Sequence, residues 1–151
     1  MNPSQIAIGG EWFLKKRERD ENRLLLVAGG VGINPILSML RHLVAESDNW
    51  SEIELIYTAC NWEEILYKKE VLELMKKLPH LNITVVLTQQ NEENLPEDID
   101  RVTFSRKRLS RETFERFDSR ETVAYLCGPP GLSDQINSWM KKTSVNYEKW
   151  W

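Results

Sequence analysis

Short apolar segments alternate with amphipathic helical patterns from residue 24 to the end of the chain, and this alternation limits the possible folds more than any other feature. Four apolar segments read as strands, at 24–28, 53–57, 83–87 and 123–127. Helical patterns follow them over roughly 34–46, 63–77, 110–117 and 130–142. Strands that alternate with helices predict right-handed crossovers and a parallel sheet with helices on both faces. We therefore expect an α/β fold, a three-layer, doubly wound parallel sheet of about five strands.

Three segments carry weaker signals. Residues 89–108 are polar and rich in turn-forming residues, so we expect mostly loop there. Ser110 is expected to cap a short helix that carries Phe114 and Phe117. The tail is expected to add a last short strand near 145–150.

The composition fits one globular domain. The chain has 151 residues, of which 41% are hydrophobic, and a formal charge of −3, which disfavours non-specific binding of nucleic acid. No apolar run approaches the roughly 18 residues of a membrane-spanning helix, so we expect no membrane span. Two cysteines, Cys60 and Cys127, are too few for a disulfide framework and suit a reducing compartment. We expect a soluble intracellular domain that works as a monomer.

The first 23 residues do not follow the alternation. A short apolar strand precedes Gly9-Gly10, a second apolar piece follows this turn, and the charged stretch 15–23 leads into the first strand of the main pattern. We therefore expect two parts, with residues 1–23 as the end of a preceding unit plus a linker and residues 24–151 as the domain.

Two predicted strands end in glycine turns. The first turn runs Ala28-Gly29-Gly30-Val31-Gly32-Ile33-Asn34-Pro35, and the second runs Cys127-Gly128-Pro129-Pro130-Gly131. Asn34 is expected to cap the following helix, with Pro35 at its first position. Ligands of open parallel sheets bind beyond the carboxyl ends of the strands, where glycine lets the backbone approach a pyrophosphate. Taken alone, the first turn is equally well explained as a tight connection, but together the two turns predict one crevice.

Several common sites are absent from the sequence. The dinucleotide fingerprint G-x-G-x-x-G does not occur, and the second strand ends in Tyr57-Thr58-Ala59-Cys60 without an acidic residue, which disfavours an ordinary Rossmann dehydrogenase. No nucleophile elbow is present, and His42 and His80 are expected to be packing or surface residues. We expect no metal site.

The paired turns make the chain resemble the NAD(P)H-binding domain of the ferredoxin–NADP⁺ reductase-like superfamily, which includes cytochrome b5 reductases. The resemblance rests on residues 24–35, on Tyr125-Leu126-Cys127-Gly128-Pro129-Pro130 and on residues 57–67. In that family the domain is coupled to an N-terminal flavin-binding barrel, and residues 8–13 are similar to the barrel's closing segment. The barrel's flavin motif, R-x-Y-[ST], is missing. The resemblance therefore implies that FAD is held by a domain outside this chain and that the chain alone is inactive, and it suggests a mitochondrial location.

The resemblance also implies roles for individual residues in hydride transfer from nicotinamide C4 to flavin N5. Cys127 would orient the nicotinamide ring, and Trp151 or Trp150 would cover the flavin face. Gln89 cannot supply the cationic contact that a 2′-phosphate needs, so NADH is favoured over NADPH, although Arg101, Arg106 or Lys107 could substitute. The cofactor-binding residues would be Gly29, Gly30, Val31, Gly32, Ile33, Asn34 and Pro35 at the first turn, Thr88 and Gln89 at the adenosine ribose, and Gly128 and Pro129 at the nicotinamide.

Two alternatives remain open. The chain could be a non-catalytic interaction domain that keeps the fold without using a nucleotide. It could also be a flavodoxin-like domain that binds FMN itself. For the NAD(P)H-binding domain that the resemblance implies, the expected partner is a flavin-binding domain or an electron acceptor protein.

Overall fold

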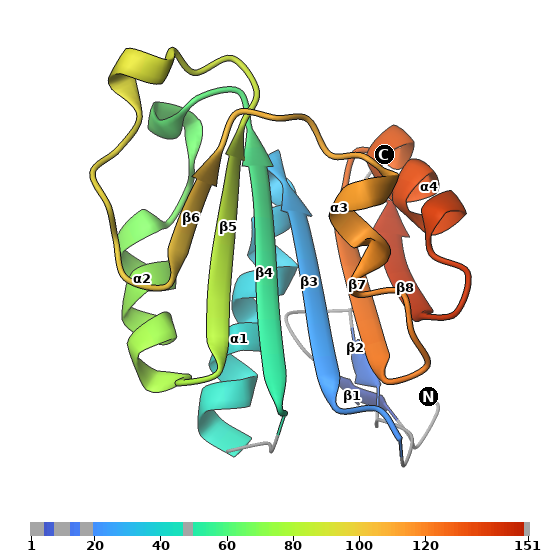
Figure 1. The fold of residues 1–151 in the computed structure, drawn as a ribbon. Coiled ribbons are helices and arrows are strands. Elements are labelled where there is room, and N and C mark those ends of the chain that lie inside the picture. The colour runs from blue at the N-terminus through green and yellow to red at the C-terminus, as the bar shows by residue number, and fades with distance from the viewer. Residues whose placement is uncertain (1–4, 8–12, 16–19, 47–49, 150–151) are drawn as a thin grey trace.

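A single parallel sheet forms the centre of the molecule (Figure 1). The computed structural model describes residues 5–7, 13–15, 20–46 and 50–149. The strand order is β6-β5-β4-β3-β7-β8, and every pairing within the sheet is parallel. The strands are β3 (Arg23–Gly29), β4 (Glu52–Ala59), β5 (Leu81–Leu87), β6 (Val102–Ser105), β7 (Thr122–Gly128) and β8 (Ser144–Lys149).

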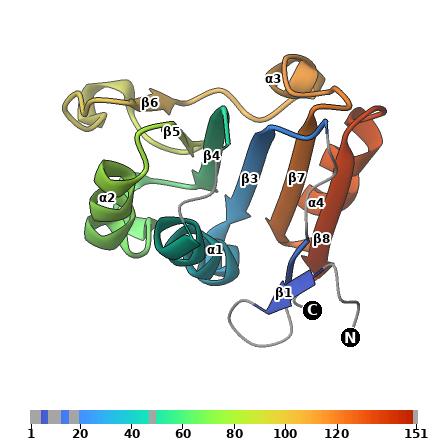
Figure 2. The same cartoon turned by 90° about the horizontal axis from the view of Figure 1, so that it is seen from below.

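Helices cover both faces of the sheet, which confirms the predicted three-layer α/β fold. Helices α1 and α2 lie on one face and α3 and α4 on the other (Figure 2). Successive residues of β3 therefore alternate between two apolar cores, with Leu24 and Leu26 in one and Leu25 and Val27 in the other. The helices are α1 (Ile33–Glu46), α2 (Lys68–Lys77), α3 (Arg111–Glu115) and α4 (Pro130–Trp139).

The chain reverses its direction across the sheet at β3. From β3 it proceeds through α1 to β4 on one side, whereas β7 pairs with β3 on the other side. The loops that follow β3 and β7 consequently leave the same edge in opposite directions. In open α/β sheets this switch point is where ligands bind.

The sheet has six strands, where about five were expected, because β6 lies within the segment that was predicted to be mostly loop. This strand has four residues at the edge of the sheet, and none of them is fully buried. A short, half-exposed edge strand leaves no period-2 apolar pattern for sequence analysis to detect. The predicted last strand is confirmed as β8 at the other edge.

Helix boundaries differ from the prediction at three places. The second helix begins at Lys68 rather than near residue 63, because Tyr67 has φ 58° and separates it from a 3₁₀ turn at Trp62–Glu64. The last helix ends at Trp139. Asn34 does not cap α1: it is the second residue of the helix, and its Nδ2 donates to the carbonyl oxygen of Val31 at 3.2 Å. The predicted cap at Ser110 is confirmed as a capping box with Thr113, but the helix ends at Glu115, so it carries Phe114 and not Phe117.

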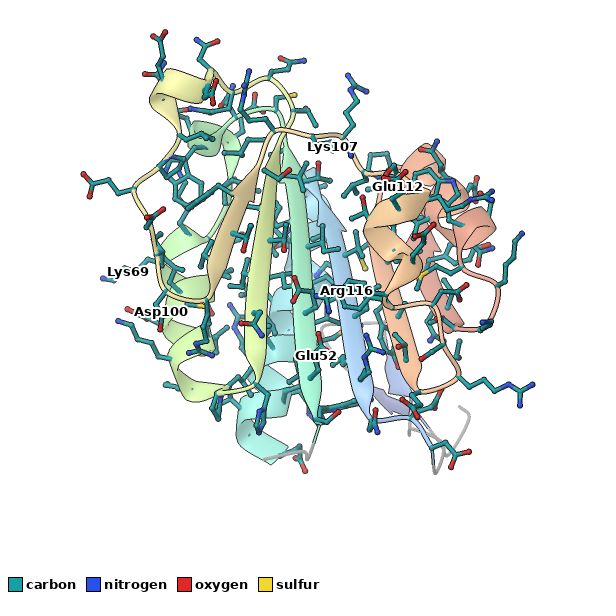
Figure 3. The ribbon with its side chains drawn as sticks, in the orientation of Figure 1. Glu52, Lys69, Asp100, Lys107, Glu112 and Arg116 are labelled. Atoms are coloured by element: carbon teal, nitrogen blue, oxygen red, sulfur yellow. The ribbon has the colours of Figure 1, made fainter. Side chains whose placement is uncertain are left out.

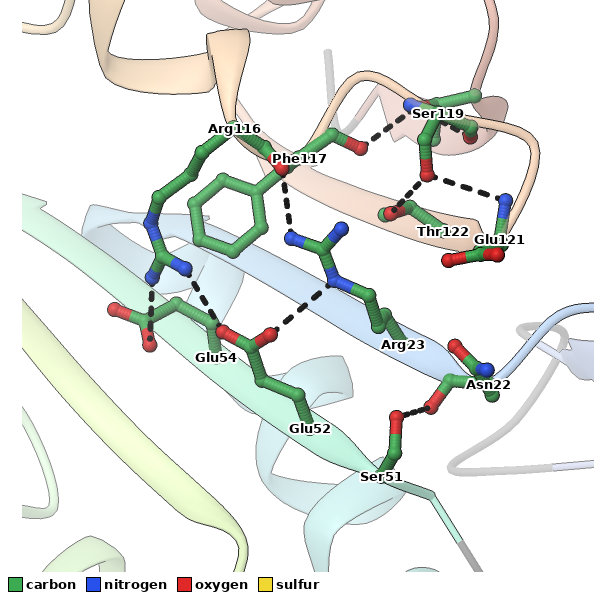
Figure 4. A network of polar contacts seen from close by, with 11 residues as sticks. Asn22, Arg23, Ser51, Glu52, Glu54, Arg116, Phe117, Ser119, Glu121 and Thr122 are labelled. Carbon is green, nitrogen blue, oxygen red and sulfur yellow. Dashed lines mark hydrogen bonds and ion pairs between the residues drawn. The ribbon is translucent and has the colours of Figure 1, made fainter.

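A polar network fastens the end of α3 to β3 and β4 (Figure 4). Arg116 pairs with Glu52 at 2.9 Å and with the buried Glu54 at 3.5 Å, and Arg23 pairs with Glu52 at 3.2 Å. The Arg116 guanidinium carbon lies 3.9 Å from the centroid of the Phe117 ring. Burial raises the pKa of Glu54, against the opposing effects of a hydrogen bond from Thr84 and the charge of Arg116.

The N-terminal strands lie outside the main sheet. Strands β1 (Gln5–Ala7) and β2 (Phe13–Lys15) form an antiparallel pair of their own. The Gly9-Gly10 turn predicted between them falls outside the described residues. The division into residues 1–23 and 24–151 stays a prediction.

Candidate functional site

The two glycine turns touch each other at the switch point, although 96 residues separate Gly32 from Gly128. A Cβ atom built on Gly32 would lie 2.1 Å from the carbonyl oxygen of Cys127 and 2.9 Å from the amide nitrogen of Gly128. A Cβ built on Gly128 would lie 3.4 Å from the Cα of Gly29. The predicted common crevice is therefore present, and only glycine fits at position 32.

Gly30 is needed for its conformation rather than for space. Its φ is +55°, in the left-handed region that L residues rarely adopt, and nothing lies within 4 Å of where its Cβ would be. The 3₁₀ turn Gly30–Gly32 that it begins leads directly into α1. Gly30 and Val31 of this turn are exposed and Gly32 is buried, so the exposed part of the turn lies at the amino end of a helix, where anions are favoured.

A cavity of about 460 Å³ opens where the turns meet. That volume is sufficient for one end of a dinucleotide. The hydroxyl of Thr58 is the one polar side-chain group of its lining, because the other members are glycine or apolar. The lining residues are Gly29, Gly30, Val31, Thr58, Pro129 and Leu132.

Sequence analysis missed Thr58 and Leu132. Thr58 lies opposite Gly29 in the parallel register of β3 and β4, so the pairing of the two strands places it at the turn. Leu132 lies in the first turn of α4, and its Cδ2 would be 2.9 Å from a Cβ on Gly29. Their position in the sequence could have indicated them, because Thr58 lies near the carboxyl end of a strand and Leu132 follows such an end, and open sheets bind ligands there.

Tyr57 is a further residue that sequence analysis did not select. Its side chain is 2% exposed, and its hydroxyl accepts the N–H of Leu66 at 3.0 Å and donates to the carbonyl oxygen of Gly30 at 3.5 Å. Burial raises the pKa of this hydroxyl, although the Leu66 hydrogen bond acts in the opposite direction. The neutral hydroxyl connects the first glycine turn to the loop before α2.

The other predicted residues of the first turn fall into three groups. Gly29 and Gly30 line the cavity, as does Val31, whose side chain is 54% exposed. Ile33 and Pro35 have buried side chains, so only their backbone remains for a ligand. Asn34 uses its side-chain amide to hold Val31.

Thr88 and Gln89 lie at the same edge of the sheet but beyond β4. Their amides donate to the carbonyl oxygens of Ala59 at 3.0 Å and Cys60 at 2.7 Å, which ties the end of β5 to the end of β4. Gln89 is exposed. They are therefore separated from the glycine turns by one strand, along the direction in which an extended dinucleotide would lie.

The two residues predicted to be catalytic have different outcomes. Cys127 is 1% exposed and belongs to the apolar core that faces α1, and neither Cys127 nor Cys60 forms a disulfide. Its carbonyl, rather than its thiol, is the group that meets Gly32. Trp151, like Trp150, falls outside the described residues, and its role stays a prediction.

Arg101 was one of three possible contacts to a 2′-phosphate, and the structure contradicts this. Its guanidinium donates to the carbonyl oxygens of Met75, Leu78 and Leu81, each at 2.9 Å, so it closes the end of α2. These carbonyls lie between the last turn of α2 and the first residue of β5, whereas Thr88 follows the end of β5. The other two residues, Arg106 and Lys107, do lie at the carboxyl edge, just beyond β6.

Among the residues described, no cluster of three His, Cys, Asp or Glu side chains could hold a metal ion. The described helices include none that is both long and apolar enough to cross a bilayer.

The all-parallel sheet with paired glycine turns at its switch point is the architecture of an NAD-binding oxidoreductase domain, and its fold is similar to those of a cytochrome b5 reductase domain and a ferredoxin-NADP⁺ reductase. Among solved structures, the cytochrome b5 reductase domain of Ulva prolifera nitrate reductase matches with a TM-score of 0.66 at 20% identity, over 89% of this chain and 53% of that one. The chain belongs to the oxidoreductase NAD-binding domain family, whose sequence model matches residues 26–138.

Several known proteins are similar to this chain over most of its length. Human oxidoreductase NAD-binding domain-containing protein 1 is 36% identical over 97% of this chain and 51% of its own length. A soybean inducible nitrate reductase [NADH] is 28% identical over 82% of this chain and 13% of its own length. A flavohemoglobin from Malassezia yamatoensis, solved with bound FAD and heme, has a TM-score of 0.67 at 21% identity over 89% of this chain and 33% of that one. The chain thus spans about half the length of the human relative.

Proposed function

We propose that this chain binds NADH and positions its nicotinamide for hydride transfer to a flavin held by a domain outside residues 24–151. The observation that carries the proposal is the contact between the two glycine turns, which leaves no room for a Cβ at Gly32 and opens a cavity beside Thr58. When bound, the nicotinamide supplies the hydride and the flavin accepts it.

The chain's own residues bind and orient. The backbone of Gly29 and Gly30 approaches the pyrophosphate at the amino end of α1, where the helix dipole favours its charge. Gly128 and Pro129 border the nicotinamide, and the Thr58 hydroxyl offers it a polar contact. Cys127 orients the ring from behind and does not act as a nucleophile, since its side chain is buried. Thr88 and Gln89 contact the adenosine ribose.

The human relative is about twice as long as this chain, which supports a separate flavin-binding domain. Residues 1–23 belong to the end of that domain and its linker. The FAD of the flavohemoglobin structure is a property of that protein, and we propose the same flavin here. We also propose that the domain is a monomer, that it is located in mitochondria, and that it does not oxidise NADH without its flavin partner.

A matched pair of variants at Gly30 tests nucleotide binding. Asn and Asp both tolerate a left-handed conformation, have the same shape and meet no obstacle at this position, so they differ in charge alone. NADH at about 100 times its Kd should stabilise the native chain by about 2.7 kcal/mol, which raises Tm by roughly 5–11 °C. Gly30→Asp should weaken NADH binding at least tenfold relative to Gly30→Asn, because it places a carboxylate beside the pyrophosphate.

The result also separates the alternatives. If neither NADH nor NADPH at millimolar concentration raises Tm, the chain does not use a nucleotide, and the non-catalytic interaction domain becomes the better hypothesis. A purified chain with the yellow colour of bound FMN would instead favour the flavodoxin-like alternative. An NADH oxidation assay with an artificial acceptor, run on this chain and on the longer protein, tests the dependence on the flavin domain.

A further inference from the structure

Arg106 is held beside the residues that would contact the adenosine ribose. Its Nε donates to the carbonyl oxygen of Gln90 at 2.7 Å, and Gln90 follows Gln89 directly. Its Nη1 lies 3.9 Å from Oε2 of Glu92, and 46% of its side chain is exposed. The guanidinium thus keeps one edge on the protein backbone and turns another edge to solvent and to Glu92.

This position is fixed from several sides. Gln90 is 6% exposed, its Oε1 accepts the N–H of Trp62 at 2.9 Å, and its Nε2 donates to the carbonyl oxygen of Asn94 at 2.6 Å. Phe104, two residues before Arg106, packs edge-on against the Trp62 ring, with 5.3 Å between centroids. The buried Gln90 therefore joins three segments: the loop after β4 and the turn Glu92–Asn94 through its side-chain amide, and the end of β6 through its backbone carbonyl. A cation so placed keeps its geometry before any ligand arrives.

Glu92 stands where an anionic ligand group would meet this cation. Its side chain is 83% exposed, and its only described partner is Arg106. The neighbouring cation, Lys107, lies 3.9 Å from Glu112 on α3, and both are at the carboxyl edge in Figure 3. Glu93 and Arg108 are also exposed nearby in sequence. Arg106 is the cation that the structure anchors next to Gln89.

We infer that the Arg106–Glu92 pair determines whether this site takes NADH or NADPH. The two nucleotides differ by a phosphate on the 2′-oxygen of the adenosine ribose, which carries close to two negative charges. The inference rests on the proposed nucleotide site. Glu92 neutralises Arg106 and repels that phosphate, so NADH is preferred. Without the Glu92 carboxylate, the free edge of Arg106 pairs with the phosphate as a bidentate donor.

Charge-neutral substitutions test the pair. Glu92→Gln keeps the size of the side chain and removes its charge. Glu97→Gln is the matched control, because Glu97 is an exposed acid of the same loop that has no described contact with Arg106. Arg106→Gln, alone and combined with Glu92→Gln, removes the cation. Kd for NADH and for NADPH would be measured by calorimetry on the native chain and on each variant, at low and at physiological salt.

Glu92→Gln should tighten NADPH binding about fivefold at low salt, as expected for one unit charge near 4 Å in a water-like medium, and leave NADH within twofold. Glu97→Gln should change both by less than twofold, since exposed charges at longer range are screened. Adding Arg106→Gln should abolish the gain for NADPH.

The inference is wrong if Glu92→Gln and Glu97→Gln change the NADPH-to-NADH ratio equally, or if the gain survives the loss of Arg106. If no variant and neither nucleotide gives a binding isotherm, the proposed function itself fails, and the inference falls with it. Unchanged Tm values without nucleotide would show that the substitutions leave the fold intact.

Discussion

A methyl group at Gly32 should be enough to separate the two turns that form the site. In Gly32→Ala the new Cβ would lie 2.1 Å from the Cys127 carbonyl oxygen and 2.5 Å from its carbon. Real Cβ contacts are essentially never under 3.0 Å, so the segments must move apart by roughly 0.9 Å. The obstacle is the backbone of Cys127 and Gly128 at the end of β7, which cannot rotate away. We expect a loss of about 3 kcal/mol of unfolding free energy, at the upper end for overpacking.

Denaturant unfolding and thermal melts measure this loss. For a chain of this size, 3 kcal/mol lowers Tm by roughly 6–12 °C. Gly131→Ala is the control: it lies in α4, nothing is within 4 Å of its Cβ position, and alanine should stabilise the helix by about 0.5–1 kcal/mol. NADH affinity should fall at least tenfold in the first variant and stay unchanged in the second. If Gly32→Ala matches the native chain in both stability and affinity, the turns are not in contact as described.

Three further predictions concern residues around this site and at the opposite side of the sheet. Tyr57→Phe removes the hydroxyl that accepts the Leu66 N–H and donates to the Gly30 carbonyl. We expect the unfolding free energy in urea to fall by about 1 kcal/mol and NADH binding, measured by calorimetry, to weaken. Equal affinity for NADH would exclude Tyr57 as a positioning residue. Burial raises the pKa of Glu54, so the folded chain binds this proton more tightly than the unfolded chain does, and the unfolding free energy should fall as pH rises from 4.5 through the folded pKa. Thermal melts across this pH range should show the fall in the native chain and not in Glu54→Gln. The same pH profile in both proteins would contradict this assignment. Burial opposes ionisation of Asp118, but hydrogen bonds from the amides of Lys142 and Thr143 outweigh it and lower its pKa, so this carboxylate stabilises the fold above its ordinary pKa of 3.8 and less as pH falls through the folded value. Asp118→Asn should therefore cost about 1 kcal/mol at pH 7, with a smaller difference from the native chain in acid, and an equal difference at both pH values would refute the assignment.

Those features of the fold that depend on burial could be predicted from the sequence. Every residue of β7 is buried and β3 is buried from Leu24 onward, so each reads as a continuous apolar run, and the glycines after them mark the turns. Edge strand β6 was missed because its four residues are half-buried or exposed. The start of α2 was misplaced because a tyrosine gives no sign of the left-handed conformation that Tyr67 has, which bulky residues rarely adopt.

The contact between the two glycine turns was predictable from the sequence, whereas the side chains that hold their backbone were not. Glycine is visible in a sequence because its lack of a side chain is the property that matters, so Gly29, Gly30 and Gly32 could be selected directly. Tyr57 looks like one more aromatic residue of a buried strand, and Arg101 looks like one more cation near a loop. Their different roles follow from which carbonyls they reach, and that depends on the register of β4 against β3 and on the path from α2 to β5.

The same distinction explains why Arg106 and Arg101 differ in position and partners, although the sequence offered both for the same phosphate. The four residues between them are the edge strand β6, so the two side chains leave opposite ends of this strand. Arg101 spends its donors on three backbone carbonyls at the amino end, which leaves it no role at the nucleotide. Arg106 donates one hydrogen bond to the Gln90 carbonyl at the carboxyl end and turns another edge of its guanidinium to solvent and to Glu92. A strand that sequence analysis does not detect thus decides which of two similar cations lies at the carboxyl edge of the sheet, where we propose that the nucleotide binds.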